Sequence, residues 1–163
     1  MSFLEHSMSN QHRILVGHQV NPANDTLTVA VLDRPGSGGA CHAYQVSGAN
    51  MARHPFMRQA VREFAGSDLS DAQLDAAFAQ ASDGDTSSLI LFQDGPIAEA
   101  GVNGVTHEVL LAILIDRLEG FQAGPYACDA NSMALEHIKY AQQHLLERTR
   151  ERMARGVEGT HKV

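Results

Sequence analysis

A chain of 163 residues is long enough for one ordinary domain, or for a small domain with a sizeable extension, and a hydrophobic content of 44% excludes wholesale disorder. The formal net charge of -7 argues against binding to nucleic acid polymers, unless basic residues are concentrated in one place. The two distant cysteines, Cys41 and Cys128, lack the spacing of a zinc module or a disulfide framework, which favours a reduced, cytoplasmic protein.

The first hundred residues are expected to form a small antiparallel sheet over residues 12–100. Residues 1–11 are polar and aperiodic, so we expect a disordered leader there and not a signal peptide. Turn-forming Pro, Gly, Asn and Asp residues separate short runs that are rich in β-branched side chains. These runs predict four strands, at residues 13–16, 26–32, 42–46 and 88–92.

A helical insertion is predicted between the third and fourth strands, at about residues 52–82. Apolar residues recur at helical spacing over residues 55–65 and again over residues 69–81. Ser70 or Asp71 is suited to cap the second of these helices. The sequence assigns no role to the insertion beyond covering an exposed sheet.

The last third of the chain predicts a long antiparallel helical hairpin, at residues 101–155. Thr106 is suited to cap a first helix that runs to about Phe121. After a tight Ala-Gly-Pro break, a second helix begins near residue 127 and ends before Gly156. The final residues, 156–163, then form a C-terminal tail.

The predicted fold class is therefore α+β, with a small N-terminal sheet and short helices followed by a hairpin that oligomerises. Oligomerisation is expected because the first hairpin helix is apolar nearly all round, most clearly over residues 109–115. Its partner helix covers only one side of it, so the other side packs against another copy of the chain or against the sheet region. Residues 109–115 are also the longest apolar run, which is far too short to span a membrane.

Basic residues gather in the second hairpin helix, where five of the chain's twelve lie between Lys139 and Arg155. A stripe of apolar side chains along this helix (Ala134, Ile138, Ala141 and Leu145) continues into Arg148 and Arg152. Like charges one turn apart repel each other modestly, but they bind well to an anion placed between them, and arginine suits phosphate oxygens. The arginine pair, Arg148 and Arg152, is thus a candidate phosphate site. The alternative is that Glu147 and Glu151 form ordinary solvated ion pairs with it.

Two further candidate ligand-binding residues lie near the other end of the hairpin. The ring of Phe121 is suited to stack on a purine, and the carboxamide of Asn131 is suited to hydrogen-bond a base or ribose edge. These residues are about 25 Å from the arginine pair along a helix with a rise of 1.5 Å per residue. A neighbouring antiparallel copy would bring the two groups together, which again indicates a site at a subunit interface.

Other patterns carry less information. The glycine-rich residues 36–39 lack the Lys-Ser/Thr of a phosphate-binding loop, and residues 101–106 offer only an ordinary helix start to an anion. His6, His12 and His18 share no face, so we expect neither a metal site nor a cofactor. No nucleophile, acid–base pair or catalytic triad has a credible setting, so we expect a protein that is not an enzyme.

Several motifs, in order along residues 89–163, resemble those of a bacteriophage family. They are residues 91–97 (LFQDGPI), 101–106 (GVNGVT), 115–118 (IDRL), 121–128 (FQAGPYAC), 148–152 (RTRER) and 156–160 (GVEGT). The family is the Thoeris anti-defence sponges of the first type, whose helical hairpin is shared with an anti-CBASS sponge. The part before residue 89 resembles the family only in having a few strands ahead of the hairpin.

The resemblance implies that the protein binds cyclic ADP-ribose isomers, such as glyco-cyclic ADP-ribose, made by TIR-domain immune sensors. It would sequester them intact in the cytoplasm of the infected host, as a homodimer or homohexamer. Carried over by position, Phe121 would stack on the base, Asn131 would make a polar contact, and Arg148 and Arg152 would hold the diphosphate. Some relatives also bind cyclic di- or trinucleotides of CBASS immunity in a separate pocket, which this sequence does not place.

The sequence departs from the family pattern just before Asn131. Many relatives carry an arginine and a glutamate where this chain has Asp129 and Ala130. The loss of a positive charge there is expected to weaken anion binding or to change which cyclic nucleotide is preferred. Two other functions stay open: direct blocking of a host protein by an oligomeric hairpin, and degradation of the signal.

Overall fold

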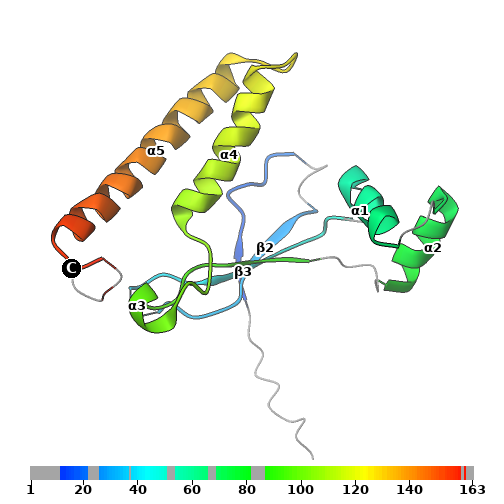
Figure 1. Ribbon diagram of the computed structural model, residues 1–163. Coiled ribbons are helices and arrows are strands. Elements are labelled where there is room, and N and C mark those ends of the chain that lie inside the picture. Colours follow the sequence, from blue (N-terminus) through cyan, green and yellow to red (C-terminus); the bar gives the residue numbers. More distant parts are fainter. Residues whose placement is uncertain are drawn as a thin grey trace, which may run out of the picture. The chain divides into compact units, whose positions relative to one another are not determined.

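The computed structural model describes residues 12–21, 26–36, 38–50, 54–65, 69–81, 87–158 and 160 (Figure 1). The predicted leader, residues 1–11, lies outside them. The chain divides into two compact units, residues 1–90 and 91–163, and each is described here by itself. No helix among the described residues is long and apolar enough to cross a membrane.

The first unit is built on a four-stranded sheet, as the α+β prediction requires. Its strands are β1 (Arg13–Leu15), β2 (Thr28–Val31), β3 (Ala43–Ser47) and β4 (Ser88–Leu91), in the spatial order β1-β2-β3-β4. The pairs β1–β2 and β2–β3 are antiparallel, with Val31 opposite Arg13 on one side and Tyr44 on the other. Val31 is also one of the two buried apolar side chains among the described residues.

The connection between β2 and β3 is held by the carboxylate of Asp33. Its two oxygens accept hydrogen bonds from the backbone N–H groups of His42, at 2.7 Å, and Ala43, at 3.1 Å. These bonds favour the ionised carboxylate and, led by the bond from His42, lower the pKa of Asp33 below its ordinary value. The acceptor is therefore charged at neutral pH, and charge-assisted bonds of this kind fix the start of β3.

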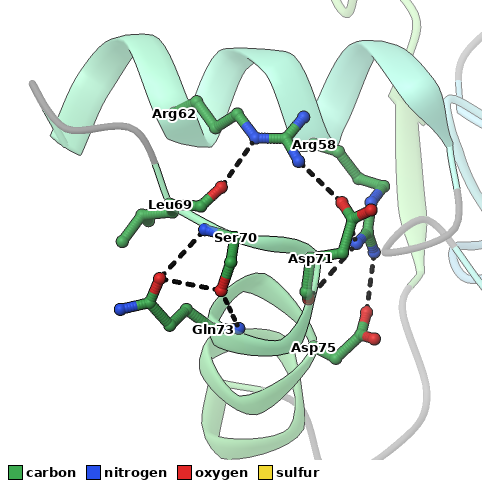
Figure 2. Close-up of polar contacts among 7 residues, drawn as sticks. All are labelled: Arg58, Arg62, Leu69, Ser70, Asp71, Gln73 and Asp75. Carbon is green, nitrogen blue, oxygen red and sulfur yellow. Dashed lines mark hydrogen bonds and ion pairs between the residues drawn. The ribbon is translucent and has the colours of Figure 1, made fainter.

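The predicted insertion forms two helices, α1 (Pro55–Ala65) and α2 (Asp71–Ala81), joined by an ion-pair network. Arg58 contacts Asp75 at 2.7 Å and Asp71 at 3.0 Å, and Arg62 contacts Asp71 at 2.6 Å (Figure 2). The hydrogen bonds and charges of Arg58 and Arg62 lower the pKa of Asp71. Leu74 of α2 is fully buried and is the other buried apolar side chain of the described chain.

Ser70 caps α2, as the sequence predicted, through a reciprocal arrangement with Gln73. The Gln73 Oε1 atom accepts from the Ser70 backbone N–H at 2.9 Å, and Ser70 Oγ lies 3.4 Å from the Gln73 backbone nitrogen (Figure 2). This is a capping box, which satisfies two donors that the helix start would otherwise leave unpaired.

The second unit begins with a loop that leads into the hairpin. Phe92 pairs with Val105 in a short parallel bridge, and between them lies one turn of helix, α3 (Ile97–Ala100), which the sequence did not predict. The Asn103 side chain closes this loop, because it accepts from the Asp94 N–H at 3.0 Å and donates to the Asp94 carbonyl at 2.8 Å. Gly104 packs closely against the Phe92 backbone, since a Cβ atom at position 104 would collide with it.

Helices α4 (His107–Gln122) and α5 (Asp129–Ala154) form the predicted antiparallel hairpin (Figure 1). Thr106 caps α4, with its hydroxyl 3.4 Å from the Val109 nitrogen, which confirms the predicted start. Across the hairpin, the Gln142 amide donates to the Glu108 carbonyl at 3.2 Å, and Lys139 pairs with Glu119 at 2.5 Å.

The face of α5 that packs on α4 differs from the predicted stripe. Ile138, Leu145 and Arg152 are partly buried on it, but Ala134 and Ala141 are exposed. The partly buried residues recur at spacings of four and three along the helix: Asn131, Leu135, Ile138, Gln142, Leu145, Thr149 and Arg152. The sequence missed this stripe because it contains polar residues at four of its seven positions, whereas the prediction followed the small apolar residues beside it.

Candidate ligand-binding site

Arg148 lies on the exposed flank of α5, near its C-terminal end. Its side chain makes no hydrogen bond or ion pair within the described part of the chain, and the predicted pairs with Glu147 and Glu151 do not form there. Glu108, in the first turn of α4, is the carboxylate whose titration Arg148 influences. Burial raises the pKa of Glu108, but its own backbone N–H, Thr106 and the charge of Arg148 together lower it below its ordinary value.

Arg152, one turn further on, is held by the segment that follows the helix. Its Nε atom donates to Glu158 Oε2 at 2.9 Å, and its Nη2 atom donates to the carbonyls of Val157 at 3.1 Å and Thr160 at 3.0 Å. The arginine pair therefore consists of one exposed guanidinium and one that is fixed. Both are positive, and one helical turn separates them, which suits a ligand with two neighbouring phosphates.

Phe121 lies in the last turn of α4, at the other end of the hairpin, where Arg117 and Tyr126 adjoin it. The Arg117 guanidinium carbon lies 5.0 Å from the centroid of its ring, one turn earlier on the same helix. The Tyr126 ring meets it edge-on, with centroids 6.4 Å apart and planes at 88°. Aromatic and cationic groups thus adjoin at this end, an arrangement that suits a nucleobase next to an anionic group.

Asn131 lies in the first turn of α5, close to the same loop. Its Nδ2 atom is 3.5 Å from the Tyr126 carbonyl, which is at the outer limit of a hydrogen bond. The loop itself is fixed by Gln122, whose Oε1 atom accepts from the Cys128 N–H at 3.0 Å. Phe121 and Asn131 are therefore brought to the same end of the hairpin, as predicted.

A single chain does not bring this end of the hairpin to the arginine pair. Asn131 and Arg148 lie on one uninterrupted helix, α5 (Asp129–Ala154), and a helix rises about 1.5 Å per residue, so about 25 Å separates them. A cyclic dinucleotide-sized ligand is much shorter than this. The four predicted residues form one site only if a second copy supplies one of the two groups.

The hairpin has the surface that such an association needs. No residue of α4 or α5, both fully described, is buried, although α4 is rich in Leu, Ile and Val. Val109, Ile113 and Leu114 of α4 are 46%, 60% and 46% exposed. Several exposed apolar side chains on one helix are typical of an association surface.

The sequence did not identify Arg117, Tyr126 and Glu158 as contacts of the predicted site residues. Arg117 stands four residues before Phe121, a spacing at which helical side chains meet, so this contact was detectable. Tyr126 and Glu158 lie after helix ends, and their contacts depend on turn geometry that periodicity does not report. Asp129 and Ala130, the departures from the family pattern, are exposed in the first turn of α5.

The hairpin part of the chain is similar to known proteins. Residues 85–150 match the family described as Acb2/Tad1, hairpin domain. A relative named Thoeris anti-defense 1, from Bacillus phage SBSphiJ7, is 49% identical over 70 residues, which cover 43% of this chain and 49% of the relative. The chain thus spans about half the length of this curated relative. The resemblance expected from the sequence is confirmed for this part of the chain.

Proposed function

We propose, from the premise that residues 85–150 belong to the Acb2/Tad1 hairpin domain family, that this protein is a phage anti-defence sponge. It binds cyclic ADP-ribose isomers, such as glyco-cyclic ADP-ribose, in the cytoplasm of the infected host and thereby inhibits Thoeris immunity. The observation that carries the proposal is the arginine pair, one turn apart, at the end of a hairpin related to that of a Thoeris anti-defense protein.

The chemistry of the arginine pair matches the diphosphate of this ligand class. Arg148 is exposed and has no hydrogen bond or ion pair within the described residues, so its guanidinium is available to an incoming anion. Arg152 is already oriented by its contacts to the segment after the helix. Two guanidinium groups offer several charge-assisted hydrogen bonds, each of which contributes about 1.5–3 kcal/mol.

The base of the ligand is recognised by residues of the other hairpin end. The ring of Phe121 stacks on the adenine, and the Asn131 amide contacts a base or ribose edge. With the diphosphate bound by two arginines, these contacts are sufficient for a nanomolar dissociation constant, which corresponds to about -12 kcal/mol. Asp129 and Ala130 adjoin Asn131 and influence which isomer is preferred.

The complete site is formed between copies of the chain. The exposed face of α4, with Val109, Ile113 and Leu114, packs against a second copy. In an antiparallel arrangement, Phe121 and Asn131 of one copy then approach the arginine pair of the other. The protein is accordingly a homodimer, or a homohexamer assembled from dimers. Cyclic di- or trinucleotides of CBASS immunity are a second ligand class to test on the same assembly.

Sequestration needs tight binding and no catalysis. The experiment that tests it incubates the purified protein with cyclic ADP-ribose isomers, removes the protein by filtration, and then releases the ligand by heat. We expect the free isomer to be depleted and then recovered with its mass unchanged. Recovery of breakdown products alone would identify an enzyme, and absence of depletion would refute binding of this ligand class.

A second function, direct blocking of a host protein, is favoured by the same exposed face of α4. The two functions differ in what the arginine pair does. Replacement of Arg148 and Arg152 by alanine abolishes ligand binding but preserves the oligomer if the protein is a sponge. A direct inhibitor would retain its anti-defence activity in the absence of any bound nucleotide.

A further inference from the structure

The end of α5 is a Schellman motif, which fixes the path of the chain beyond it. Gly156 adopts a φ of 67°, and its N–H donates to the Met153 carbonyl at 2.9 Å. The Val157 N–H donates to the Arg152 carbonyl at 3.0 Å. These are the two hydrogen bonds that define the motif, and the chain after Gly156 therefore turns back over the last helical turn.

The described residues of the returning segment supply three acceptors to the Arg152 side chain. The Arg152 guanidinium binds the Glu158 carboxylate and the carbonyls of Val157 and Thr160, at 2.9–3.1 Å. The segment is itself closed by the Thr160 hydroxyl, which donates to the Val157 carbonyl at 2.7 Å. The C-terminal turn, residues 156–158 and 160, is thus a small structure organised around Arg152.

This arrangement differs from an ordinary surface ion pair. The Arg152 side chain is 21% exposed and the Glu158 side chain 36% exposed, so solvent screens the pair less than it screens most pairs on the surface. An unrestrained arginine has many rotamers, and a ligand that binds it must restrict them. In the C-terminal turn, that restriction is already present before any ligand binds.

We propose that Glu158 is a positioning residue for anion binding by the arginine pair. This inference rests on the proposed function. Glu158 does not touch the ligand; it orients the Arg152 guanidinium so that the diphosphate meets one fixed and one mobile arginine.

The test compares Glu158→Gln with a matched control, Glu151→Gln. Both substitutions remove one negative charge near the arginine pair, but the Glu151 side chain is exposed and makes no hydrogen bond or ion pair with Arg152 among the described residues. Calorimetry with glyco-cyclic ADP-ribose is expected to show roughly tenfold weaker binding for Glu158→Gln, because Arg152 must then be ordered by the ligand. Glu151→Gln is expected to stay within about twofold of the wild type.

A second measurement reports on Arg152 directly. The Arg152 Nε–H resonance, assigned with Arg152→Lys, is expected to exchange slowly with water in the wild type and in Glu151→Gln, and rapidly in Glu158→Gln. Circular dichroism and light scattering establish that the Glu158→Gln protein keeps its helices and its oligomeric state. Unchanged or tighter binding by Glu158→Gln, or a protected Nε–H in it, would overturn the inference.

Titration with inorganic pyrophosphate separates this inference from the proposed function. If the wild type binds no cyclic ADP-ribose isomer, but pyrophosphate shifts the Arg152 Nε–H signal and does so more weakly in Glu158→Gln, only the proposed ligand is wrong. If pyrophosphate leaves that signal unmoved in a wild type that also binds no isomer, both proposals fail.

Discussion

Arg117 lies over the ring of Phe121, with its guanidinium carbon 5.0 Å from the ring centroid, at the loop end of the helical hairpin. A cation in this position holds the ring by a cation–π interaction and limits the ring's rotation. The residue proposed to stack on the ligand's base is therefore oriented before binding, as Arg152 is at the other end.

Phe121 is expected to contribute the stacking energy of the base. Phe121→Ala should weaken binding of glyco-cyclic ADP-ribose by about tenfold to a hundredfold, since a base–aromatic stack contributes roughly 1–3 kcal/mol. Phe121→Tyr keeps the ring and is the matched control, for which calorimetry should find an affinity close to that of the wild type. Equal losses for both variants would argue against stacking.

Arg148 is expected to act on the titration of Glu108. The charge of Arg148 is among the causes that lower the pKa of Glu108, so Arg148→Ala should raise that pKa toward its ordinary value. A carbon-detected NMR titration of the Glu108 carboxyl measures this change, with Arg150→Ala as the control. An identical Glu108 titration in both variants would show that the two residues do not interact.

The same shift predicts how Glu108 contributes to the free energy of unfolding. A pKa that is lower in the folded protein than in the unfolded chain means that folding favours the ionised form. This stabilisation is present above the unfolded pKa and is lost as the pH falls through the folded pKa. Glu108→Gln should therefore reduce stability at pH 7 but have little effect in strong acid, as urea denaturation at both pH values would reveal.

Gly104 is expected to be intolerant of any side chain. A Cβ atom there would approach the backbone of Phe92 and Gln93 closer than real contacts allow. Gly104→Ala should cost about 1–3 kcal/mol of stability, the usual penalty of overpacking. Gly120→Ala is the matched control: nothing lies within 4 Å of its Cβ position, and it should stabilise α4 by about 0.5–1 kcal/mol. Thermal denaturation that ranks the two in the opposite order would contradict the close packing of this loop.

The exposed face of α4 is expected to hold the copies of the chain together. Ile113 is 60% exposed, and Ile113→Glu would place a charge in the proposed interface. Light scattering should then find a smaller assembly, and ligand binding should be lost, because the two halves of the site belong to different copies. Gln143→Glu adds a charge on exposed α5 and should change neither property. A wild type that is already monomeric would contradict this account.

The sequence predicted most of the architecture because its signals are local. Thr106 before an apolar run and Gly156 after the last helical residue marked both outer ends of the hairpin, and both act there as predicted. The short helix α3 was missed, since a single turn has too few residues for a periodic pattern. The row of partly buried residues on α5 was predicted only in part. Its polar members, such as Gln142, pack through hydrogen bonds, and a pattern of apolar residues does not reveal these.

The residue types of the candidate site were predictable from the sequence, but the contacts that restrain their side chains were not. Arginine spacing on a helix indicates an anion site whether or not the side chains are restrained. That Arg152 is fixed and Arg148 is not depends on residues 156–158 and 160, which are positioned by the Schellman motif and its hydrogen bonds. Such a turn brings Glu158 to Arg152 without any periodic signal in the sequence.

The most direct test of the central claim is calorimetry of glyco-cyclic ADP-ribose with the wild type, with Arg148→Ala/Arg152→Ala, and with Arg150→Ala/Arg155→Ala as the control for lost charge. The account predicts nanomolar binding that falls by at least about a hundredfold in the first double variant only, with the helical content and the oligomer preserved. Unchanged binding by Arg148→Ala/Arg152→Ala, or an equal loss in the control, would contradict the assignment of the arginine pair as the diphosphate site.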